Sequence, residues 1–499
     1  MRLSTRKQCK ALDQKAQSEF GLRPEVLMES AGAAVAEEVN TLIKNKKCRV
    51  LVLAGSGNNG ADGFVIARLL KRKGFANLAC VIVREKASPS GIWTLQLSKA
   101  QNSGVEILRV SGDRMKMEVG NSEVIVEAIL GTGFSSSLDA ELSDLVQFIN
   151  SKNKVTIAVD APIGLDIDTG LEKPKALRAT MTVTFGLSKP GFYVARGPRC
   201  VGQVKVHGIG FPQKLLRDEC QSHFAWGAHA SREALPGRDE LSNKSDHGTV
   251  HVIAGSSEYP GAGLLSANAA GRAGAGYVYL HGATNVYQHV QMIPEVILRD
   301  AAKWDWKSID KKSTVIVGPG LGVNAATETW IRELLKRKWE RVILDADALT
   351  VLAEKKIWPL PSEWIVTPHA GELSRILGRT VKSLNADRFA AAIEAQKKLC
   401  CVVLFKGFRT VVADSSSRAI VILSGNSGLA KAGSGDVLGG FVAAFRAQGL
   451  SATRAACLGA YLHGRLANEW VHSGKDIISL LPSDLSVAVP QLIHRIRSL

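Results

Sequence analysis

The segment Gly433-Ser-Gly-Asp436 places three small residues and one carboxylate where a helix is expected to begin. An apolar run at residues 419–423 precedes it, and apolar residues then recur at helical spacing from Val437 to Phe445. Backbone N–H groups at a helix N-terminus bind anions, and the helix dipole favours negative charge there. An ordinary N-capped helix is the alternative, but such a cap does not need three small residues before an acid. The pattern therefore favours phosphoryl chemistry, with Asp436 beside the phosphate.

A second polar cluster follows the first expected strand of the chain. Residues 54–63, Ala-Gly-Ser-Gly-Asn-Asn-Gly-Ala-Asp-Gly, contain the spacing G-x-G-x-x-G between a strand and a helix. A dinucleotide-binding turn would be followed by an acid at the end of the next strand, and Glu85 fits that position poorly. Asn58, Asn59 and Asp62 supply amide oxygens and a carboxylate, which suit a ligand or a cation better than a turn that needs only glycine.

The succession of short apolar strand, Gly-containing turn and amphipathic helix occurs in both halves of the chain. Continuous apolar strands separated by helices are typical of parallel sheets covered on both faces. Residues 211–245 are polar and irregular, which places a boundary near residue 225. The sequence therefore predicts an α/β protein of two doubly wound domains, residues 1–220 and 225–499. The expected strands are residues 49–54, 78–83, 123–126, 155–159 and 181–185 in the first domain, and 249–254, 313–317, 341–344, 364–367 and 401–405 in the second.

Several strands of the second half end in residues that could bind a ligand. In a parallel sheet the carboxyl ends of the strands meet at one edge, where ligands bind. Lys406 can bind phosphate there, whereas His369 by itself is more typical of a structural histidine. Asp345 and Asp347 could likewise form only a turn and a cap. The convergence of these residues on one edge is what indicates a site.

Composition excludes several classes of protein. The chain has 499 residues, 45% hydrophobic and 22% charged, and its formal charge of +17 is dispersed along the sequence. A nucleic-acid-binding face would need a concentrated basic stripe, so no nucleic-acid partner is expected. The eight cysteines form no Cys-x-x-Cys pair, which favours free thiols in a reducing compartment. The chain has no apolar leader and no run of about 18 apolar residues, so we expect a cytoplasmic protein without a membrane partner.

The second half resembles the ribokinase-like superfamily and, within it, the NAD(P)H-hydrate dehydratases, from about residue 245 to the C-terminus. The motifs that carry the resemblance are Gly318-Pro-Gly-Leu-Gly322, Asp345-Ala-Asp-Ala-Leu349, Thr367-Pro-His-Ala-Gly-Glu372, Gly425-Asn-Ser-Gly-Leu429 and Ala432-Gly-Ser-Gly-Asp-Val-Leu438. The resemblance implies that ADP or ATP, with Mg2+, drives the removal of water from the S epimer of hydrated NADH or NADPH. These small-molecule substrates are NADHX and NADPHX.

The resemblance also implies a role for each residue of this site. Asp436 would act as base near the reacting C6 hydroxyl. Residues Gly433, Ser434 and Gly435 would form the anion hole for the transferred phosphate. The nucleotide would be held by Lys406, Gly407, Phe408, Arg409, Thr410 and Gly435, and the hydrate site would be lined by Ala262, Gly322, His369 and Asp436.

The first half resembles the NAD(P)H-hydrate epimerases over about residues 1–215, in a Rossmann-like domain. The matching motifs are Met28-Glu-Ser-Ala-Gly32, the Asn-Asn-Gly-Ala-Asp loop, Gly131-Thr-Gly133 and Val159-Asp-Ala-Pro162. The order, epimerase and then dehydratase, is that of bifunctional nicotinamide-nucleotide repair enzymes. The resemblance implies that Asp160 interconverts the R and S hydrates by acid-base catalysis. It also implies contacts to the hydrate from Asn58, Asn59, Gly60, Ala61, Asp62, Gly131, Thr132, Gly133, Phe134, Ser135, Ser136 and Ser137.

A potassium ion (K+) is implied near Asn59, Glu127 and Ile163, but two of these positions depart from the family. The family has Asp where this chain has Glu127, and Ser where it has Ile163. The longer Glu could still reach a cation with adjustment, whereas Ile offers only its backbone carbonyl. At the cation site, unlike at the other motifs, two residues differ from those of the family.

Two other functions are compatible with parts of the sequence. One is a ribokinase-like vitamin-precursor kinase fused to a Rossmann-type oxidoreductase, although a pyrophosphate turn has no use for the paired amides of Asn58 and Asn59. The other is a nucleotide-binding regulatory protein without catalysis, although a carboxylate at position 436 would weaken simple phosphate binding. A bifunctional repair enzyme, assembled as a homo-oligomer, is the prediction.

Overall fold

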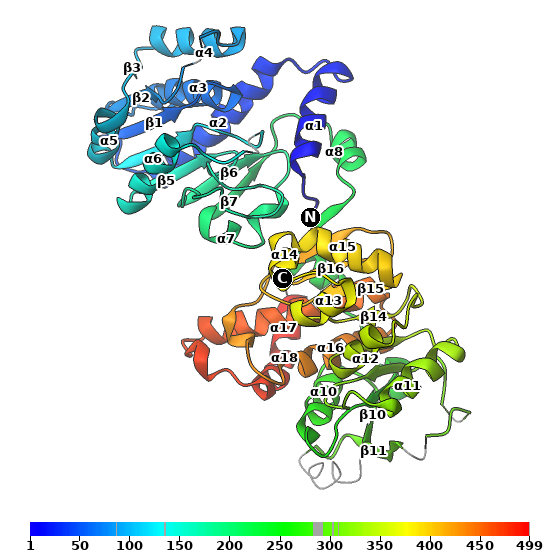
Figure 1. Cartoon of the computed structure of the whole chain (residues 1–499). Coiled ribbons are helices and arrows are strands. Elements are labelled where there is room, and N and C mark those ends of the chain that lie inside the picture. The colour runs from blue at the N-terminus through cyan, green and yellow to red at the C-terminus, as the bar shows by residue number, and fades with distance from the viewer. Residues whose placement is uncertain (86, 134–135, 283–292, 302–303, 308, 499) are drawn as a thin grey trace. The chain divides into compact units, whose positions relative to one another are not determined.

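We describe a computed structural model of the chain, which comprises residues 1–499 except 86, 134–135, 283–292, 302–303, 308 and 499 (Figure 1). The chain forms two compact units. One consists of residues 2–223, and the other of residues 224–499 together with Met1.

The first unit is built on a seven-stranded sheet in the order β3-β2-β1-β4-β5-β6-β7. Every neighbouring pair of strands is parallel. The central strands are continuous buried runs, as expected for a sheet covered on both faces. The strands are β1 (Val50–Ala54), β2 (Leu78–Ile82), β3 (Glu106–Leu108), β4 (Val124–Ala128), β5 (Val155–Val159), β6 (Met181–Phe185) and β7 (Gln203–His207).

Helices cover both faces of this sheet. Apolar side chains of α2, α3 and α4 pack on one face, and those of α5 and α6 pack on the other. The helices of the unit are α1 (Arg6–Ser18), α2 (Pro24–Leu42), α3 (Asn58–Arg72), α4 (Gly91–Asn102), α5 (Gly112–Asn121), α6 (Ala140–Ser151), α7 (Gly197–Cys200), α8 (Gln213–Glu219) and the 3-10 turn η1 (Pro190–Phe192).

Two glycines of the G-x-G-x-x-G segment are required by close packing at the start of α3. A Cβ at Gly55 would lie 1.9 Å from the Ile129 carbonyl oxygen, and a Cβ at Gly60 would lie 1.8 Å from the Gly55 carbonyl oxygen. Both distances are far inside van der Waals contact. The glycine spacing therefore brings the helix start against the ends of β1 and β4, and it leaves Asn58 and Asn59 at that edge.

The second unit is built on a ten-stranded sheet in the order β11-β10-β9-β12-β13-β14-β15-β16-β17-β8. The strands from β11 to β15 are parallel, whereas β15, β16 and β17 pair antiparallel. The strands are β8 (His223–Trp226), β9 (Thr249–Ile253), β10 (Tyr277–Gly282), β11 (Ile297–Asp300), β12 (Thr314–Val317), β13 (Val342–Leu344), β14 (Ile365–Val366), β15 (Val402–Phe405), β16 (Val411–Ala413) and β17 (Ala419–Ile422).

Helix α16 (Ser434–Ala447) is the central helix of this unit, and nearly all of its residues after Asp436 are buried. It packs against α10 and α17. The other helices are α9 (Ala228–Ala234), α10 (Pro260–Arg272), α11 (Ala325–Lys336), α12 (Asp347–Glu354), α13 (Ala370–Leu377), α14 (Val381–Ala386), α15 (Arg388–Leu399), α17 (Ala452–His472) and α18 (Pro482–Arg497), with 3-10 turns η2 (Lys244–His247), η5 (Ser427–Leu429) and η6 (Ile477–Ser479).

The prediction of two doubly wound α/β units is confirmed, and each predicted strand is present within one or two residues. The predicted strands of the second sheet are parallel to one another, and β16 and β17 extend that sheet antiparallel beyond β15. Residues 211–245, expected to be irregular, contain α8, β8 and α9. Strand β8 belongs to the second sheet, where it lies beside β17.

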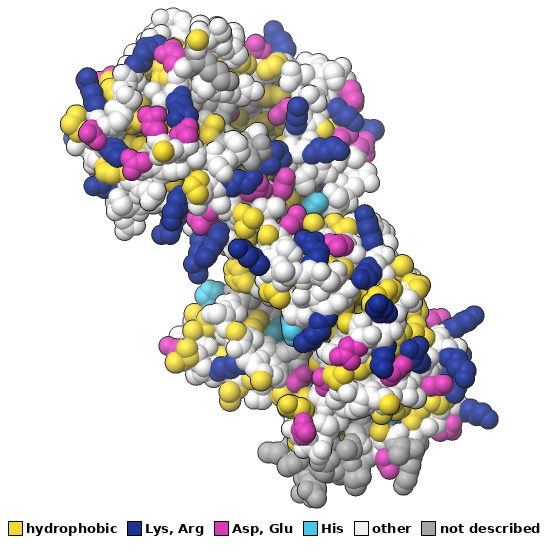
Figure 2. Space-filling model, viewed as in Figure 1, with side chains coloured by type: hydrophobic (Ala, Val, Ile, Leu, Met, Phe, Trp, Pro, Cys, Tyr) yellow, Lys and Arg dark blue, Asp and Glu magenta, His cyan; other side chains and the backbone are white. Residues whose placement is uncertain are grey.

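The surface has no concentrated basic face in the view drawn. Figure 2 shows Lys and Arg side chains scattered among Asp and Glu over both units. No helix in the described part of the chain combines the length and apolarity needed to cross a membrane.

Candidate functional site

The second unit gathers the predicted phosphate-site residues at the carboxyl edge of its sheet. Strands β12, β13, β14 and β15 are neighbours in that order, so the segments that follow them lie side by side. These segments contain the motifs that begin at Gly318, Asp345, Thr367 and Lys406. Helix α16 begins against them, because a Cβ at Gly435 would lie 3.5 Å from Lys406 Nζ.

Lys406 is the central cation of this edge. Its Nζ lies 2.7 Å from Asp345 Oδ1 and 4.0 Å from Glu372 Oε2, and its side chain is only 18% exposed. Burial opposes the charge, but Asp345 and Glu372 outweigh it and raise the pKa of Lys406. The ammonium therefore stays charged beside the start of α16, as phosphate binding requires.

The pKa of the Asp436 carboxyl is raised toward neutral pH. Burial, reinforced by the nearby charge of Asp345 and opposed by Lys406, raises the pKa of Asp436 from 3.8 to about 7. A general base works best when its pKa lies near the operating pH. Glu372 is similar, because burial raises its pKa to about 7.

The start of α16, where the sequence predicts an anion-binding turn, is fixed by close packing and by one side-chain contact. Gly433 adopts a left-handed conformation with φ of 88°, and a Cβ there would lie 2.7 Å from Leu265. The Ser434 hydroxyl lies 3.0 Å from His463 Nε2 on α17. Burial lowers the pKa of His463 to about 4, so the imidazole is neutral and holds the serine without adding charge.

The residues predicted to line the hydrate site lie at the same edge. Gly320 is tightly packed against Ala262, since a Cβ there would lie 3.0 Å from that side chain. The Gly322 N–H donates to Asp347 Oδ2 at 2.8 Å. His369 Nδ1 accepts from the Gly371 and Glu372 N–H groups, its Nε2 lies 3.4 Å from Glu372 Oε1, and its side chain is more than half exposed.

The predicted nucleotide segment, Lys406 to Thr410, is the turn between β15 and β16. Arg388 holds the start of this turn, because its Nη2 donates to the Phe405 and Lys406 carbonyls at 3.0 Å. A Cβ at Gly407 would lie 2.8 Å from the same guanidinium. Phe408 is 53% exposed, so an apolar surface is available to a planar base.

The first unit places Asp160 at the end of β5 in a left-handed conformation, with φ of 65°. Such strain in a residue other than glycine is typical of functional positions. Asp160 Oδ1 accepts from the Thr184 hydroxyl at 3.0 Å and lies 3.6 Å from Lys189 Nζ. Asp62 on α3 is close enough to interact with this carboxylate, and burial raises the pKa of Asp62 well above its usual value.

Asn59 and Gly131 are brought together from α3 and the segment after β4. A Cβ at Gly131 would lie 3.3 Å from Asn59 Cγ, and the buried Asn59 Nδ2 has no hydrogen-bond partner among the described residues. Gly60 and Ala61 are buried in the first turn of α3, and Asn58 is exposed. Ser136 and Ser137 are exposed beyond Gly133, whereas Phe134 and Ser135 lie outside the described residues.

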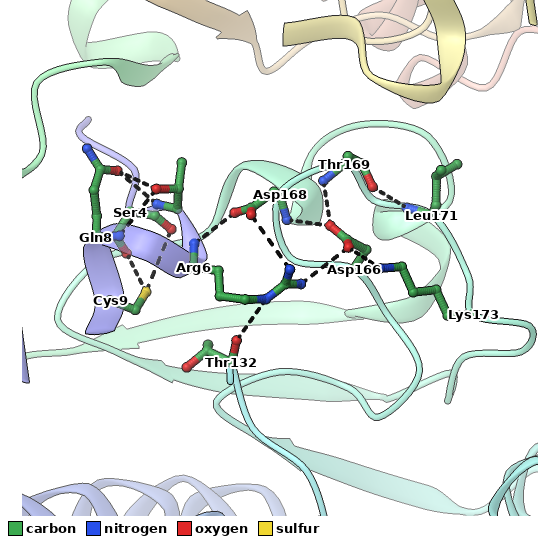
Figure 3. Close-up of polar contacts among 11 residues, drawn as sticks. Ser4, Arg6, Gln8, Cys9, Thr132, Asp166, Asp168, Thr169, Leu171 and Lys173 are labelled. Carbon is green, nitrogen blue, oxygen red and sulfur yellow. Dashed lines mark hydrogen bonds and ion pairs between the residues drawn. The ribbon is translucent and has the colours of Figure 1, made fainter. Parts of the chain in front are cut away.

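An arginine from α1 holds the Gly131-Thr-Gly133 segment (Figure 3). Arg6 Nε donates to the Thr132 carbonyl at 3.2 Å, and its Nη2 lies 3.2 Å from Asp166 Oδ2. The Arg6 backbone N–H donates to Asp168 Oδ1 at 2.8 Å. Asp166 also accepts from Lys173 and from two backbone N–H groups, and these bonds outweigh its burial and lower its pKa.

Glu127, at the end of β4, is fully buried. Its Oε1 accepts from the Ile129 N–H at 2.8 Å, and its Oε2 accepts from the Ile163 N–H at 3.0 Å. The Ile163 carbonyl accepts from the Leu177 N–H at 3.0 Å. Burial raises the pKa of Glu127 to about 7.

Two α/β units, each with polar residues gathered at the carboxyl edge of its sheet, define a two-domain enzyme. A family model described as NAD(P)H-hydrate dehydratase matches residues 250–491, and one described as YjeF-related protein N-terminus matches residues 24–191. A bifunctional NAD(P)H-hydrate repair enzyme of Moorella thermoacetica is 34% identical over 490 residues, covering 94% of this chain and 92% of that protein. One of Thermofilum pendens is 34% identical over 482 residues, covering 93% and 91%.

The second unit is also similar to a solved structure. The ADP/ATP-dependent NAD(P)H-hydrate dehydratase from Bacillus subtilis, co-crystallised with ATP and Mg2+, is 30% identical with a TM-score of 0.51. The match covers 55% of this chain and 98% of that one. The chain belongs to the family of bifunctional NAD(P)H-hydrate repair enzymes.

Several residues that shape the two sites were not assigned a role from the sequence. Asp345 and Glu372 were visible as motif residues at strand ends, and their acidity beside Lys406 was the available signal. Arg6, Lys189, Arg388 and His463 carry no motif, and their contacts depend on segments distant in the chain.

Proposed function

We propose that the chain restores hydrated NADH and NADPH, using the second unit to dehydrate the S epimer and the first to interconvert the R and S epimers. The observation that carries the dehydratase is the position of Asp436. It follows Gly433, Ser434 and Gly435 at the start of a buried helix, and Lys406 lies against the same turn. This arrangement combines a base with anion-binding groups, and the match of residues 250–491 to the NAD(P)H-hydrate dehydratase family supports the dehydratase function.

In the dehydratase step, Asp436 accepts the proton of the C6 hydroxyl as its oxygen attacks the terminal phosphorus of ADP or ATP. The bond from that phosphorus to the bridging oxygen breaks, and the electron pair leaves with the remaining nucleotide. Lys406 and the N–H groups of Gly433 and Gly435 stabilise the charge on the transferred phosphate, while the Ser434 N–H donates to the Lys431 carbonyl at 3.2 Å. Phosphate then leaves C6 with the C–O electron pair as the ring nitrogen donates its own pair. Loss of a proton from the neighbouring carbon restores the reduced ring.

The described residues suit a Mg2+ ion that is bound mainly through nucleotide phosphates. Mg2+ usually keeps several waters and takes only one or two protein carboxylates. Asp345 and Glu372 are the acids beside Lys406, and no group of three or more possible ligands (His, Cys, Asp or Glu) occurs in the described part of the chain. Magnesium would neutralise phosphate charge, and Asp345 and Glu372 are the residues that would orient it.

In the epimerase step, Asp160 accepts the proton of the C6 hydroxyl, and the bond from C6 to the ring nitrogen breaks with its electron pair going to nitrogen. The open aldehyde rotates, nitrogen adds to its other face, and Asp160 returns the proton to oxygen. No oxidant or reductant is needed. The position of Asp160 at the sheet edge, near Asp62, supports this role.

The residues expected to hold K+ do not fit that ion. Both oxygens of Glu127 accept backbone N–H groups, and such donors repel a cation. The Ile163 carbonyl already accepts from Leu177, and its side chain belongs to an apolar cluster. The Asn59 atom without a partner among the described residues is Nδ2, an N–H donor that cannot ligate a cation. The proposed reaction therefore does not use K+.

The proposal is tested by incubating the protein with a mixture of hydrated NADH epimers and ADP while the absorbance of NADH is followed. Full recovery at a rate above the spontaneous exchange of epimers is expected. Recovery of only the S fraction would limit the function to dehydration, and no recovery with either ADP or ATP would refute it. Parallel reactions with hydrated NADPH compare the two substrates.

We further propose that residues 1–220 and 225–499 fold separately, since each unit carries its own sheet and apolar core. The second piece alone is expected to dehydrate the S hydrate. Insolubility of both pieces would count against this division. The proposed location is the cytoplasm. The proposed assembly is a homo-oligomer, and light scattering on the purified chain would test that assembly.

A further inference from the structure

A buried lysine, Lys189, faces the Asp160 carboxylate and belongs to none of the motifs described above. Lys189 follows β6 and is only 1% exposed. Its Nζ donates to the Leu187 carbonyl at 2.6 Å and to the Phe185 carbonyl at 3.1 Å, and it lies 3.6 Å from Asp160 Oδ1. The two carbonyls fix the position of the ammonium, and its remaining N–H faces Asp160.

Charged groups from several elements surround this pair. Asp62 approaches from α3, Asp13 and the Cys9 thiol approach from α1, and Thr184 donates from β6. Asp160 and Asp13 therefore share one buried cation, and Asp62 lies close enough to interact with both acids. The Asp13 residue is exposed at the rim, yet partial burial and the neighbouring Asp160 raise its pKa to about 6.

Lys189 remains protonated in this environment. Burial opposes its charge, but Cys9, Asp160 and Asp13 outweigh that cost and raise the pKa of Lys189. A charged ammonium beside a carboxylate favours the ionised carboxylate, whereas the neighbouring acids oppose it. Asp160 must be ionised to accept the hydroxyl proton of the hydrate.

We propose that Lys189 is the positioning residue of the epimerase reaction, which holds the Asp160 carboxylate by charge and directs it at the substrate against the repulsion of the neighbouring Asp13. This inference rests on the proposed role of Asp160 in epimerisation. It assigns opposite effects to two neighbours of the same carboxylate. Lys189 attracts the Asp160 carboxylate, and Asp13 repels it.

The test is the pH–rate profile of R-to-S conversion, with uncatalysed exchange subtracted at each pH. In Lys189→Met the acidic limb should move to higher pH by about one unit or more. In Asp13→Asn the same limb should move to lower pH, because a like charge has been removed. Lys154→Met is the matched control, since Lys154 also holds two backbone carbonyls, of Gly120 and Ser122, but no carboxylate. Its profile should coincide with that of the wild type.

The outcomes separate this inference from the proposed function. If the wild type does not exceed spontaneous exchange, or if Asp160→Asn keeps the wild-type profile, the proposed epimerase function fails. If the wild type is active but Lys189→Met and Asp13→Asn both keep its profile, Lys189 has no positioning role. A shift in Lys154→Met equal to that in Lys189→Met would also overturn the inference. Should Lys189→Met fail to fold, as judged by thermal unfolding of the first unit, Lys189→Gln takes its place with the same expected shift, and an unchanged profile in that variant overturns the inference.

Discussion

Lys406 Nζ lies 2.7 Å from Asp345 Oδ1, and both groups lie under the first turn of α16. Asp345 partly neutralises the charge of Lys406. Asp436 therefore lies near a second carboxylate as well as near the ammonium. This is one cause of the raised pKa of Asp436, after burial.

Asp436→Asn should abolish dehydration while nucleotide binding persists. Asp436 follows the anion hole, and the N–H groups of residues 433–435 do not depend on its carboxylate. General-base steps contribute about 10²–10⁴-fold to rate, and a loss in this range is expected for the S hydrate. Calorimetric binding of ADP to the variant is the control. Near-normal turnover would mean that Asp436 is only a helix cap.

The same substitution should stabilise the second unit at alkaline pH. The pKa of Asp436 is raised to about 7 in the folded chain from an ordinary 3.8. Between these values the folded chain holds a proton that the unfolded chain has lost, so stability falls as pH rises through the window. Asn cannot ionise, and its advantage should therefore be larger at pH 8 than at pH 5. Each kcal/mol corresponds to about 2–4 °C in Tm. Equal Tm differences at both pH values would contradict this account.

The strands and their chemistry-bearing ends could be predicted because both signals are local. Continuous apolar runs identified β9 and β12–β15, and the motif residues that follow them, such as Asp345 and Lys406, lie together because parallel strands end at one edge. Strands with polar or interrupted patterns escaped prediction. Strand β7 (Gln203–His207) is one example, since its residues are only partly buried and alternate in character.

The partners of site residues could not be predicted, because they depend on contacts between distant segments. Lys189 lies in an ordinary Ser-Lys-Pro sequence, and nothing local indicates that it is buried beside Asp160. Arg388 lies near the start of a helix, where an arginine is usually solvated, yet it holds the carbonyls of β15. The roles of Lys189 and Arg388 can be recognised only in the folded chain, where strand ends and helices from distant segments meet.

Asp160→Asn should leave the R hydrate unconverted while the S hydrate is still repaired. The substitution removes the proton acceptor at the end of β5 and leaves the second unit unchanged. With roughly equal epimers, about half of a mixed pool should then recover quickly, since the general acid-base step is lost. Recovery is followed by NADH absorbance, against spontaneous exchange measured without enzyme. Equal consumption of the R form by wild type and variant would exclude epimerisation through Asp160.

Potassium should not stabilise the first unit of this protein. The oxygens of Glu127 are bound by the Ile129 and Ile163 N–H groups, so an ion finds no free carboxylate there. The Tm of the wild type should be the same in potassium chloride and in choline chloride at equal ionic strength. The double variant Glu127→Asp/Ile163→Ser, which restores the residues of the family, should become more stable in potassium than in choline. A potassium-dependent Tm in the wild type would show that Glu127 still ligates the ion.

Arg6 should control how tightly the first unit binds the hydrate. Its guanidinium joins the Thr132 carbonyl to Asp166, so it holds the segment Gly131-Thr-Gly133 that is proposed to contact the substrate. In Arg6→Gln we expect KM for the R hydrate to rise about tenfold, the value of one charge-assisted hydrogen bond, with a much smaller change in kcat. Lys15→Gln is the control, because Lys15 anchors the same helix to Glu219 without reaching this segment. If both variants raise KM equally, Arg6 acts only by fastening α1, and if neither does, the Thr132 contact has no part in binding.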